Sequence, residues 1–143
     1  MSTIWDRVAE NFSRQGLMRT LGAELLRVED GEVHIAMPFS AGLSQQLGYL
    51  HAGAVTSLVD TACGYAGLTR APEGHDIVTA EFKTNFLRPA LGERFVAVGR
   101  VENAGRSLAV CTGEVRAYAS ADTDDFKVVA LMQATMVYVA PRD

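Results

Sequence analysis

The chain has 143 residues, of which 48% are hydrophobic and 21% charged, enough for one domain with its own core and too few for two ordinary domains. Thirteen basic and 17 acidic residues leave a formal net charge of -4, which argues against a general nucleic-acid or anionic-membrane surface. The sequence has no apolar run typical of a signal peptide or a bilayer-spanning helix. We therefore expect one domain over residues 1–143 in a soluble, cytoplasmic protein that binds neither nucleic acid nor membrane.

The first element in chain order is an amphipathic helix over residues 3–16, preceded by a Ser/Thr cap. Its apolar residues recur at spacings of three to four and continue one residue beyond it, as Ile4, Trp5, Val8, Phe12 and Leu17. Residues 23–39 then predict two strands, because Asp30-Gly31 between them is typical of a tight hairpin turn. Residues 40–50, rich in Ser, Gly and Gln, predict a loop.

A long apolar helix is predicted from Ala52 to Leu68, ended by Pro72 and Gly74. The rest of the chain predicts only strands, at residues 77–89, 94–102, 107–119 and 126–139. In the first of these strands the apolar residues take even positions, which indicates a half-buried strand with Val78, Ala80, Phe82 and Phe86 on one face. Short turns between strands favour a mainly antiparallel sheet that wraps the apolar helix, an α+β fold.

The two cysteines lie far apart in the sequence, without the spacing of a metal site. We expect Cys63 and Cys111 each to be a small buried residue, with no disulfide. His34 and His75 have no partner at the spacing of a catalytic triad or a metal site. The sequence therefore predicts no metal ion.

One carboxylate, Asp60, lies within the apolar segment "LGYLHAGAVTSLVDTACGYAG" at residues 47–67. Moving a carboxylate out of water costs several kcal/mol unless partners compensate it. From the segment alone, a structural hydrogen-bonded carboxylate and a functional one are equally good interpretations.

The start of the same helix, near His51, Ala52 and Gly53, offers free backbone N–H groups for an anion or a polarised carbonyl oxygen. Asp60 lies eight residues further along, or about 12 Å of helix axis. A reacting carbonyl has to lie within about 3–3.5 Å of both its oxyanion donor and its attacking group. One chain cannot supply both, so we expect two copies to pack with these helices antiparallel and to form two equivalent sites.

The segment "QQLGYLHAGAVTSLVD" at residues 45–60 resembles the active-site segment of hotdog-fold thioesterases of the PaaI (phenylacetate-pathway) type. The segments "FKTNFLRPALGE" (82–93) and "VENAGRSLAVCTGEV" (101–115) are similar to the strand and the Gly-Arg/Lys-Ser hairpin that follow in that family. The resemblance covers the order of elements from about residue 20 to 139. It implies a hotdog fold, in which a mainly antiparallel sheet wraps one long central helix, here with an added N-terminal helix.

The resemblance implies hydrolysis of an acyl-CoA or aryl-acyl-CoA thioester, without metal or redox cofactor, by a homodimer or a tetramer. Asp60 would act as general base on water or as direct nucleophile. The N–H of Ala52, with Gly53 beside it, would hold the carbonyl oxygen at the partner's helix start, and His51 would order that turn rather than serve as the base. Gln45 matches a position often held by Asn that orients water or a carboxylate.

Thr79 matches a Ser or Thr that assists the acid in some relatives, but simple alternation places it opposite the apolar face of its strand. A bend in the strand or an interface position is needed to bring it to the acid. Arg88 and Arg106, at strand ends, are candidates for the CoA phosphates. Ser107, beside Arg106, is a further candidate for substrate binding.

Two positions depart from the family pattern, because Ala52 stands in His-Ala-Gly where His-Gly-Gly is usual and Gln45 is longer than Asn by one methylene. A backbone donor survives the change from Gly to Ala, but the added Cβ crowds the site. These departures favour one alternative, a non-catalytic acyl-CoA-binding or regulatory module of the same fold. A second alternative, an acyl-thioester dehydratase or hydratase, lacks support because no His-x-x-x-Pro-Gly pattern occurs.

Overall fold

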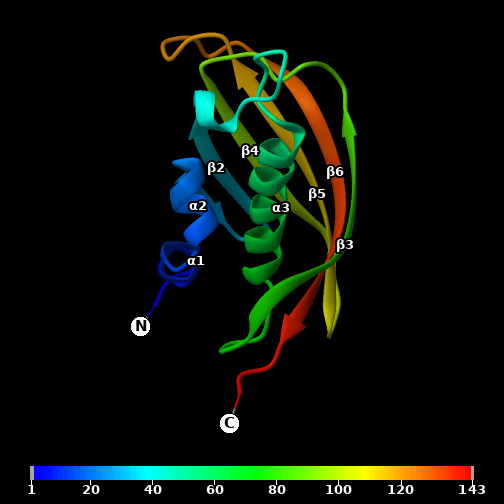
Figure 1. The fold of residues 1–143 in the computed structure, drawn as a ribbon. Coiled ribbons are helices and arrows are strands. Elements are labelled where there is room, and N and C mark those ends of the chain that lie inside the picture. The colour runs from blue at the N-terminus through cyan, green and yellow to red at the C-terminus, as the bar shows by residue number, and fades with distance from the viewer. Residues whose placement is uncertain (1, 143) are drawn as a thin grey trace.

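The protein is described here by a computed structural model, which covers residues 2–142. Six strands form one sheet, with the long helix α3 on its inner face and two short helices beside α3 (Figure 1). In chain order the elements are α1 (Ile4–Ser13), α2 (Gly16–Leu21), β1 (Glu24–Glu29), β2 (Glu32–Pro38), a 3₁₀ turn (Ala41–Leu43), α3 (Ala52–Leu68), β3 (Asp76–Phe86), β4 (Arg94–Ala104), β5 (Leu108–Tyr118) and β6 (Phe126–Val139). From β1 onward the order of helices and strands agrees with the order predicted from the sequence.

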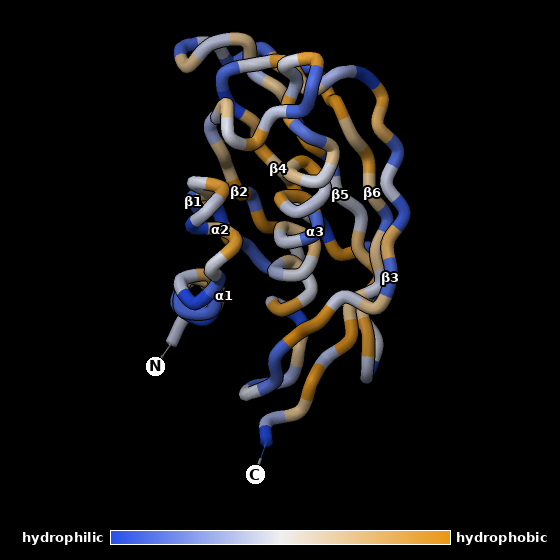
Figure 2. The backbone as a smooth tube through the Cα atoms, in the orientation of Figure 1, coloured by the Kyte–Doolittle hydropathy of each residue, from blue (hydrophilic) through white to orange (hydrophobic). Residues whose placement is uncertain are grey.

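The strands lie side by side in the order β1-β2-β4-β5-β6-β3, and every neighbouring pair is antiparallel. The predicted α+β class is therefore confirmed, with the sheet curving around α3. Along β2, β5 and β6 buried and more exposed residues alternate, because successive side chains point to opposite faces. Figure 2 shows the hydropathy of the residues along these strands. The buried set faces α3.

The N-terminal region forms two helices and not the single helix expected over residues 3–16. Thr3 caps α1 as predicted: its hydroxyl accepts from the Asp6 N–H, and the Asp6 carboxylate accepts from the Thr3 N–H. The chain breaks after Arg14, and Leu17 belongs to α2, where its side chain is 52% exposed. Only Val8 of α1 is fully buried. A single helix was predicted because the apolar spacing continues across the break between α1 and α2.

Helix α3 lies directly on the middle of the sheet because two paired glycines leave room for it. Gly99 of β4 is opposite Gly113 of β5. A Cβ atom added at Gly99 would lie 2.4 Å from the backbone of Ala62, and one at Gly113 would lie 2.6 Å from Val59. At Gly99, backbone therefore packs against backbone, which only glycine permits, while Gly113 leaves room for the Val59 and Cys63 side chains of α3.

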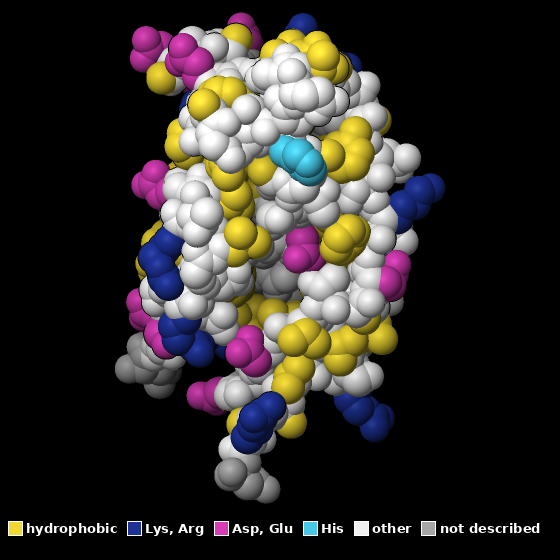
Figure 3. Space-filling model, in the orientation of Figure 1, with side chains coloured by type: hydrophobic (Ala, Val, Ile, Leu, Met, Phe, Trp, Pro, Cys, Tyr) yellow, Lys and Arg dark blue, Asp and Glu magenta, His cyan; other side chains and the backbone are white. Residues whose placement is uncertain are grey.

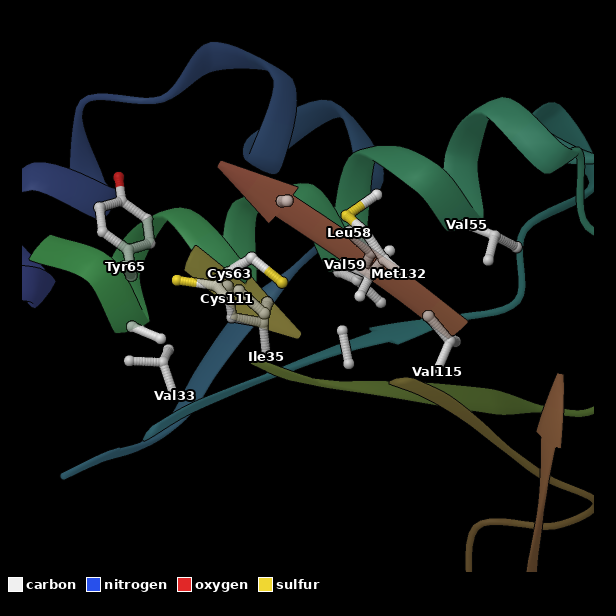
Figure 4. Close-up of a cluster of buried hydrophobic side chains, with 14 of the residues drawn as sticks. Val33, Ile35, Val55, Leu58, Val59, Cys63, Tyr65, Cys111, Val115 and Met132 are labelled. Atoms are coloured by element: carbon white, nitrogen blue, oxygen red, sulfur yellow. The ribbon is translucent and has the colours of Figure 1, made fainter. Parts of the chain in front are cut away.

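The core fills the space between α3 and the sheet, and Figure 4 shows part of it. Leu58, Val59 and Cys63 of α3 meet inward-facing residues of β2 and β5 there, with less than 1% of each side chain exposed. Cys63 and Cys111 are both buried and free, as predicted, and burial raises the pKa of each thiol, that of Cys111 to about 11. They behave as small apolar residues.

Strand β3 forms one edge of the sheet. Its apolar residues are more exposed than the sequence predicted. Val78 is 53% exposed, Phe82 44% and Phe86 49%. The alternating pattern identified the strand correctly, but its apolar residues do not share one face. The register shift after Thr79 places Val78 on the outer face, opposite Val137, while Phe82 and Phe86 stay on the inner face of this edge strand (Figure 1). An edge strand with open apolar side chains and one unpaired row of backbone groups is a surface for pairing with another chain.

None of the helices within residues 2–142 is long and apolar enough to cross a membrane.

We predict that Gly99→Val destabilises the fold by about 2 kcal/mol or more, because the three added carbons would overlap the backbone of α3. Gly16→Ala is the matched control: a Cβ atom at Gly16 meets only the end of the Arg19 side chain, at 3.8 Å. Urea unfolding of both variants at one fixed protein concentration measures the effect. An unfolding free energy of Gly99→Val within about 0.5 kcal/mol of the control would contradict the close packing described here.

Candidate active site

Asp60 lies in the middle of α3 and is half-buried. Its Oδ1 accepts a hydrogen bond of 2.7 Å from the Thr79 hydroxyl, and the cavity beside it has a volume of about 200 Å³. Burial raises the pKa of Asp60 above its ordinary value of 3.8, and the smaller, opposite effect of the Thr79 hydrogen bond lowers it. A carboxylate with a raised pKa is a stronger base, which suits it to proton abstraction.

A bulge in β3 brings Thr79 to Asp60. The register against β6 shifts between Thr79 and Glu81, so that Thr79 pairs with Met136 while Phe82 pairs with Ala134. Residues paired across a strand point to the same face, and both Met136 and Ala134 are buried under α3. The extra residue therefore lets Thr79 and Phe82 face α3 together, although one is odd and the other even. This is the bend that the sequence required.

His51 is the N-cap of α3, and its Nδ1 accepts a hydrogen bond of 2.7 Å from the Gly53 N–H. The imidazole therefore orders the turn, as the sequence analysis expects, and it uses the Gly53 donor to do so. The N–H of Ala52, the first residue of the helix, has no acceptor among residues 2–142. Of the two backbone donors named from the sequence, only Ala52 is free for a ligand.

Gln45 holds the loop before α3 in shape. Its Oε1 accepts from the N–H of Leu47 at 2.6 Å and from that of Tyr49 at 3.2 Å. Gln45 also lines a cavity of about 310 Å³, which it shares with His51, Ala52 and Arg88. The structure thus brings together four of the residues selected from the sequence.

The two halves of the candidate site lie apart within one chain. Asp60 and Thr79 line the cavity of about 200 Å³, Gln45 and Ala52 line the cavity of about 310 Å³, and no residue lines both. Eight residues of rigid helix separate the Ala52 N–H from Asp60, or about 12 Å. A single substrate carbonyl cannot reach both groups in one chain.

The open face of α3 joins the two halves. Figure 3 views this face, with a hollow near its centre and an acidic side chain at the edge of the hollow. The residues on it recur at spacings of three and four, are small or polar, and are all partly or fully exposed: Ala52, Gly53, Thr56, Ser57, Asp60, Thr61 and Gly64. The Ser57 and Thr61 hydroxyls donate to backbone carbonyls of α3 itself, so these two side chains lie close against the helix.

Arg106 and Ser107 lie at the other end of the sheet from Arg88. They form the turn between β4 and β5, where the Ser107 carbonyl accepts from the Tyr138 N–H. Arg88 follows β3 at the end near the start of α3. An 11-residue strand spans roughly 35 Å, so the structure does not place Arg106 and Arg88 around one ligand within a chain.

Sequence reasoning missed the wall of the Asp60 cavity that faces α1. Asn11 and Gln15 line it together with Tyr65, five residues after Asp60 on α3. Tyr65 could have been found from helical spacing, since residues 60, 61, 64 and 65 share one side of a helix. Asn11 and Gln15 carry no such signal, because tertiary packing alone brings them there.

Known proteins resemble this chain in sequence and in structure. A family model described as the thioesterase superfamily matches residues 47–121, more than half of the chain. The chain is 29% identical over 113 residues to the medium/long-chain acyl-CoA thioesterase YigI of Escherichia coli, covering 68% of this chain and 72% of that protein. A thioesterase family protein from Silicibacter pomeroyi superposes with a TM-score of 0.92 at 38% identity, covering 96% of this chain and 99% of that one.

The PaaI protein of the Escherichia coli phenylacetic acid degradation operon superposes with a TM-score of 0.83 at 22% identity, over 96% of this chain and 94% of that one, and shows the same fold. The chain belongs to the thioesterase superfamily. Its fold is the hotdog fold, so the class of fold and the family suggested by the sequence motifs are both confirmed.

We predict that Thr79→Ala raises the pKa of Asp60 further, because it removes the hydrogen bond that stabilises the ionised carboxylate. If the ionised form is the active one, the acid limb of the kcat/KM profile moves to higher pH. Thr79→Ser keeps the hydroxyl and is the matched control, with a limb close to that of the unmodified protein. If the acid limb of Thr79→Ala stays in place or moves to lower pH, this hydrogen bond does not stabilise the ionised form of the group that titrates.

Proposed function

We propose that this protein hydrolyses an acyl-CoA or aryl-acyl-CoA thioester to the free acid and CoA, at sites shared between two subunits of a homodimer. The observation that carries the proposal is the pairing of the half-buried Asp60, bonded to Thr79, with the unused Ala52 N–H on the same open helix face. The family supports thioester hydrolysis in general. The relative YigI is named as a medium/long-chain acyl-CoA thioesterase, which supports an acyl-CoA substrate.

In the proposed reaction the Ala52 N–H of one subunit binds the thioester carbonyl oxygen and stabilises the negative charge that develops on it. Asp60 of the other subunit removes a proton from water as the water oxygen attacks the carbonyl carbon. The carbon–sulfur bond then breaks, and the leaving thiolate of CoA takes up a proton. Direct attack by the Asp60 carboxylate, with water hydrolysing the resulting anhydride, gives the same products. Neither route needs a metal or a redox cofactor.

Antiparallel packing of two α3 helices satisfies the geometry. It places the start of one helix level with the middle of the other, so Ala52 of one chain meets Asp60 of its partner twice across a twofold axis. The small residues on this face permit close approach, and the exposed apolar side chains of Phe82 and Phe86 on the neighbouring β3 would be covered. A dimer of such dimers, giving a tetramer, is compatible with the same site.

The other site residues take supporting roles in this proposal. The side-chain NH₂ of Gln45 faces the carbonyl end of the thioester, and His51 keeps the helix start in shape. Arg88 borders the same cavity and is the better candidate for a CoA phosphate. Arg106 and Ser107 could meet the CoA nucleotide only where a second subunit brings the far end of its sheet to the site.

We predict that Asp60→Asn lowers kcat by at least about 100-fold, the usual scale for losing a positioned base or nucleophile. Asparagine keeps the size of the side chain and can still accept from Thr79. Thiol release from a panel of acyl- and aryl-CoA thioesters measures the effect. A near-normal rate would remove Asp60 from the mechanism. A protein that binds CoA thioesters but releases no thiol from any of them would be a binding module.

We predict that Ala52→Pro abolishes most activity while Ala52→Gly does not. Proline is well tolerated as the first residue of a helix, where it removes only the N–H group, and glycine keeps that donor. His51 already has an extended backbone, with φ -62° and ψ 139°, which suits the residue before proline.

Mixing unfolded Ala52→Pro and Asp60→Asn chains in equal amounts and refolding them tests the shared site directly. Each mixed dimer has one site with both Asp60 and the Ala52 N–H and one site with neither. Random pairing therefore restores about a quarter of the activity of the unmodified dimer. If both groups acted from one chain, mixing would restore nothing.

A further inference from the structure

The cavity beside Asp60 continues past the carboxylate toward α1, where its lining changes character. Ile77 and Met136 give it an apolar side, and Asn11, Gln15 and Tyr65 give it a polar end. Residues of the proposed reaction, Asp60 and Thr79, form its other side. The groups at the polar end take no part in the proposed chemistry. The cavity is therefore larger than a site for the attacking water alone.

A chain of hydrogen bonds orders the polar end. Gln15 Nε2 donates to the Tyr65 hydroxyl at 2.8 Å, and that hydroxyl donates to Asn11 Oδ1 at 3.0 Å. Asn11 Nδ2 then donates to Asp76 Oδ1 at 3.0 Å. An edge-tilted contact between the rings of Phe12 and Tyr65, with centroids 6.1 Å apart, holds the tyrosine against α1.

The carboxylate at the end of this chain fixes the direction of every bond. An Asp76 carboxylate oxygen accepts from the Asn11 NH₂ group, so Asn11 presents its own oxygen to Tyr65. Tyr65 uses its single proton on Asn11 and can only accept from Gln15. Gln15 therefore presents its NH₂ group to Tyr65, and its Oε1 has no donor among residues 2–142.

The size of the cavity limits the group that can fill it. Its volume of about 200 Å³ holds about six or seven groups of the size of a water molecule or a methylene. A chain of that length, starting at the thioester carbonyl beside Asp60, would run along Ile77 and Met136 and end at Gln15. An acyl chain of twelve carbons would extend beyond it.

We propose that this cavity binds the acyl part of the substrate and selects a compact acyl group with a hydrogen-bond donor, such as a hydroxyl, at its far end. Gln15 accepts a hydrogen bond from this donor through its open Oε1, and Tyr65 holds Gln15 in the required orientation. The inference rests on the proposed function for the identity of the thioester, but the binding preference itself does not depend on hydrolysis.

The test compares ω-hydroxyacyl-CoA thioesters of four to eight carbons with the unsubstituted and ω-methoxy thioesters of the same chain lengths. The methoxy group accepts hydrogen bonds but does not donate them. We expect kcat/KM to favour the hydroxyl by about three- to tenfold at one chain length, the range of one hydrogen bond. Dodecanoyl-CoA should be a poorer substrate than hexanoyl-CoA. Equal values for the hydroxyl and methoxy series at every length would overturn the proposal.

The residue assignment is tested with Gln15→Met, which keeps the length of the side chain without its carbonyl. The ratio of hydroxyl to unsubstituted substrate should fall to about one. Gln133→Met is the matched control, since Gln133 lies exposed on the outer face of the sheet and should leave the ratio unchanged. Tyr65→Phe should reduce the ratio in part. If Gln15→Met slows all substrates equally and keeps the ratio, Gln15 only anchors the N-terminal segment and the proposal is wrong.

Binding of non-hydrolysable analogues keeps this inference separate from the proposed function. In these analogues an S-alkyl chain, with or without a terminal hydroxyl, replaces the acyl group of CoA. If the hydroxyl analogue binds more tightly and Gln15→Met loses this difference, the proposed selectivity of the cavity is supported even when no thioester is hydrolysed. Hydrolysis without any preference in rate or binding would overturn the inference and leave the proposed function standing.

Discussion

The rigidity of α3 is the constraint from which the rest of the site follows. A helix rises by a fixed amount per residue, so the free N–H of Ala52 and the carboxylate of Asp60 are held apart in every copy of the chain. No rotamer of Asp60 can close that separation. The same rigidity becomes an advantage when two such helices pack antiparallel, because both groups then arrive preorganised and need not move during the reaction.

The sheet controls how much of Asp60 meets water. Gly99 and Gly113 let α3 sink onto the middle strands, which buries one side of the helix and leaves Asp60 at the boundary. Burial raises the pKa of this carboxyl group, and the Thr79 hydroxyl partly compensates. The compensation exists only because β3 carries a bulge after Thr79. Two backbone features, a glycine pair and a bulge, thus act in opposite directions on the pKa of Asp60.

The sequence predicted most of the fold because its signals are local. Turn residues and the spacing of apolar residues, two in strands and three to four in helices, predicted the ends of α3, the capping of α1 and all six strands. The break between α1 and α2 was missed, since apolar spacing continued across it. The burial of β3 was predicted wrongly because simple alternation assumes a regular strand, whereas the bulge after Thr79 places Val78 on the opposite face from Phe82 and Phe86.

The site was predictable to the extent that one segment contains it. Asp60, His51 and Ala52 lie within residues 51–60 and stand out by charge and position in an apolar helix. Asn11, Gln15 and Tyr65 come together only through the packing of α1 against the end of α3, and no short pattern encodes that contact. Thr79 needed a bulge that alternation alone does not reveal.

The exposed edge at β3 and the open face of α3 are best understood as one surface. Exposed phenylalanines on a long edge strand favour association, and small residues on the adjacent helix face set how closely a second helix can approach. In the proposed dimer, the surface that drives association is also the surface that completes the active site. An isolated chain would then hold a carboxylate without its oxyanion donor, so catalysis and dimerisation would be lost together. Activity per chain should therefore fall on dilution at the same concentration at which the dimer dissociates.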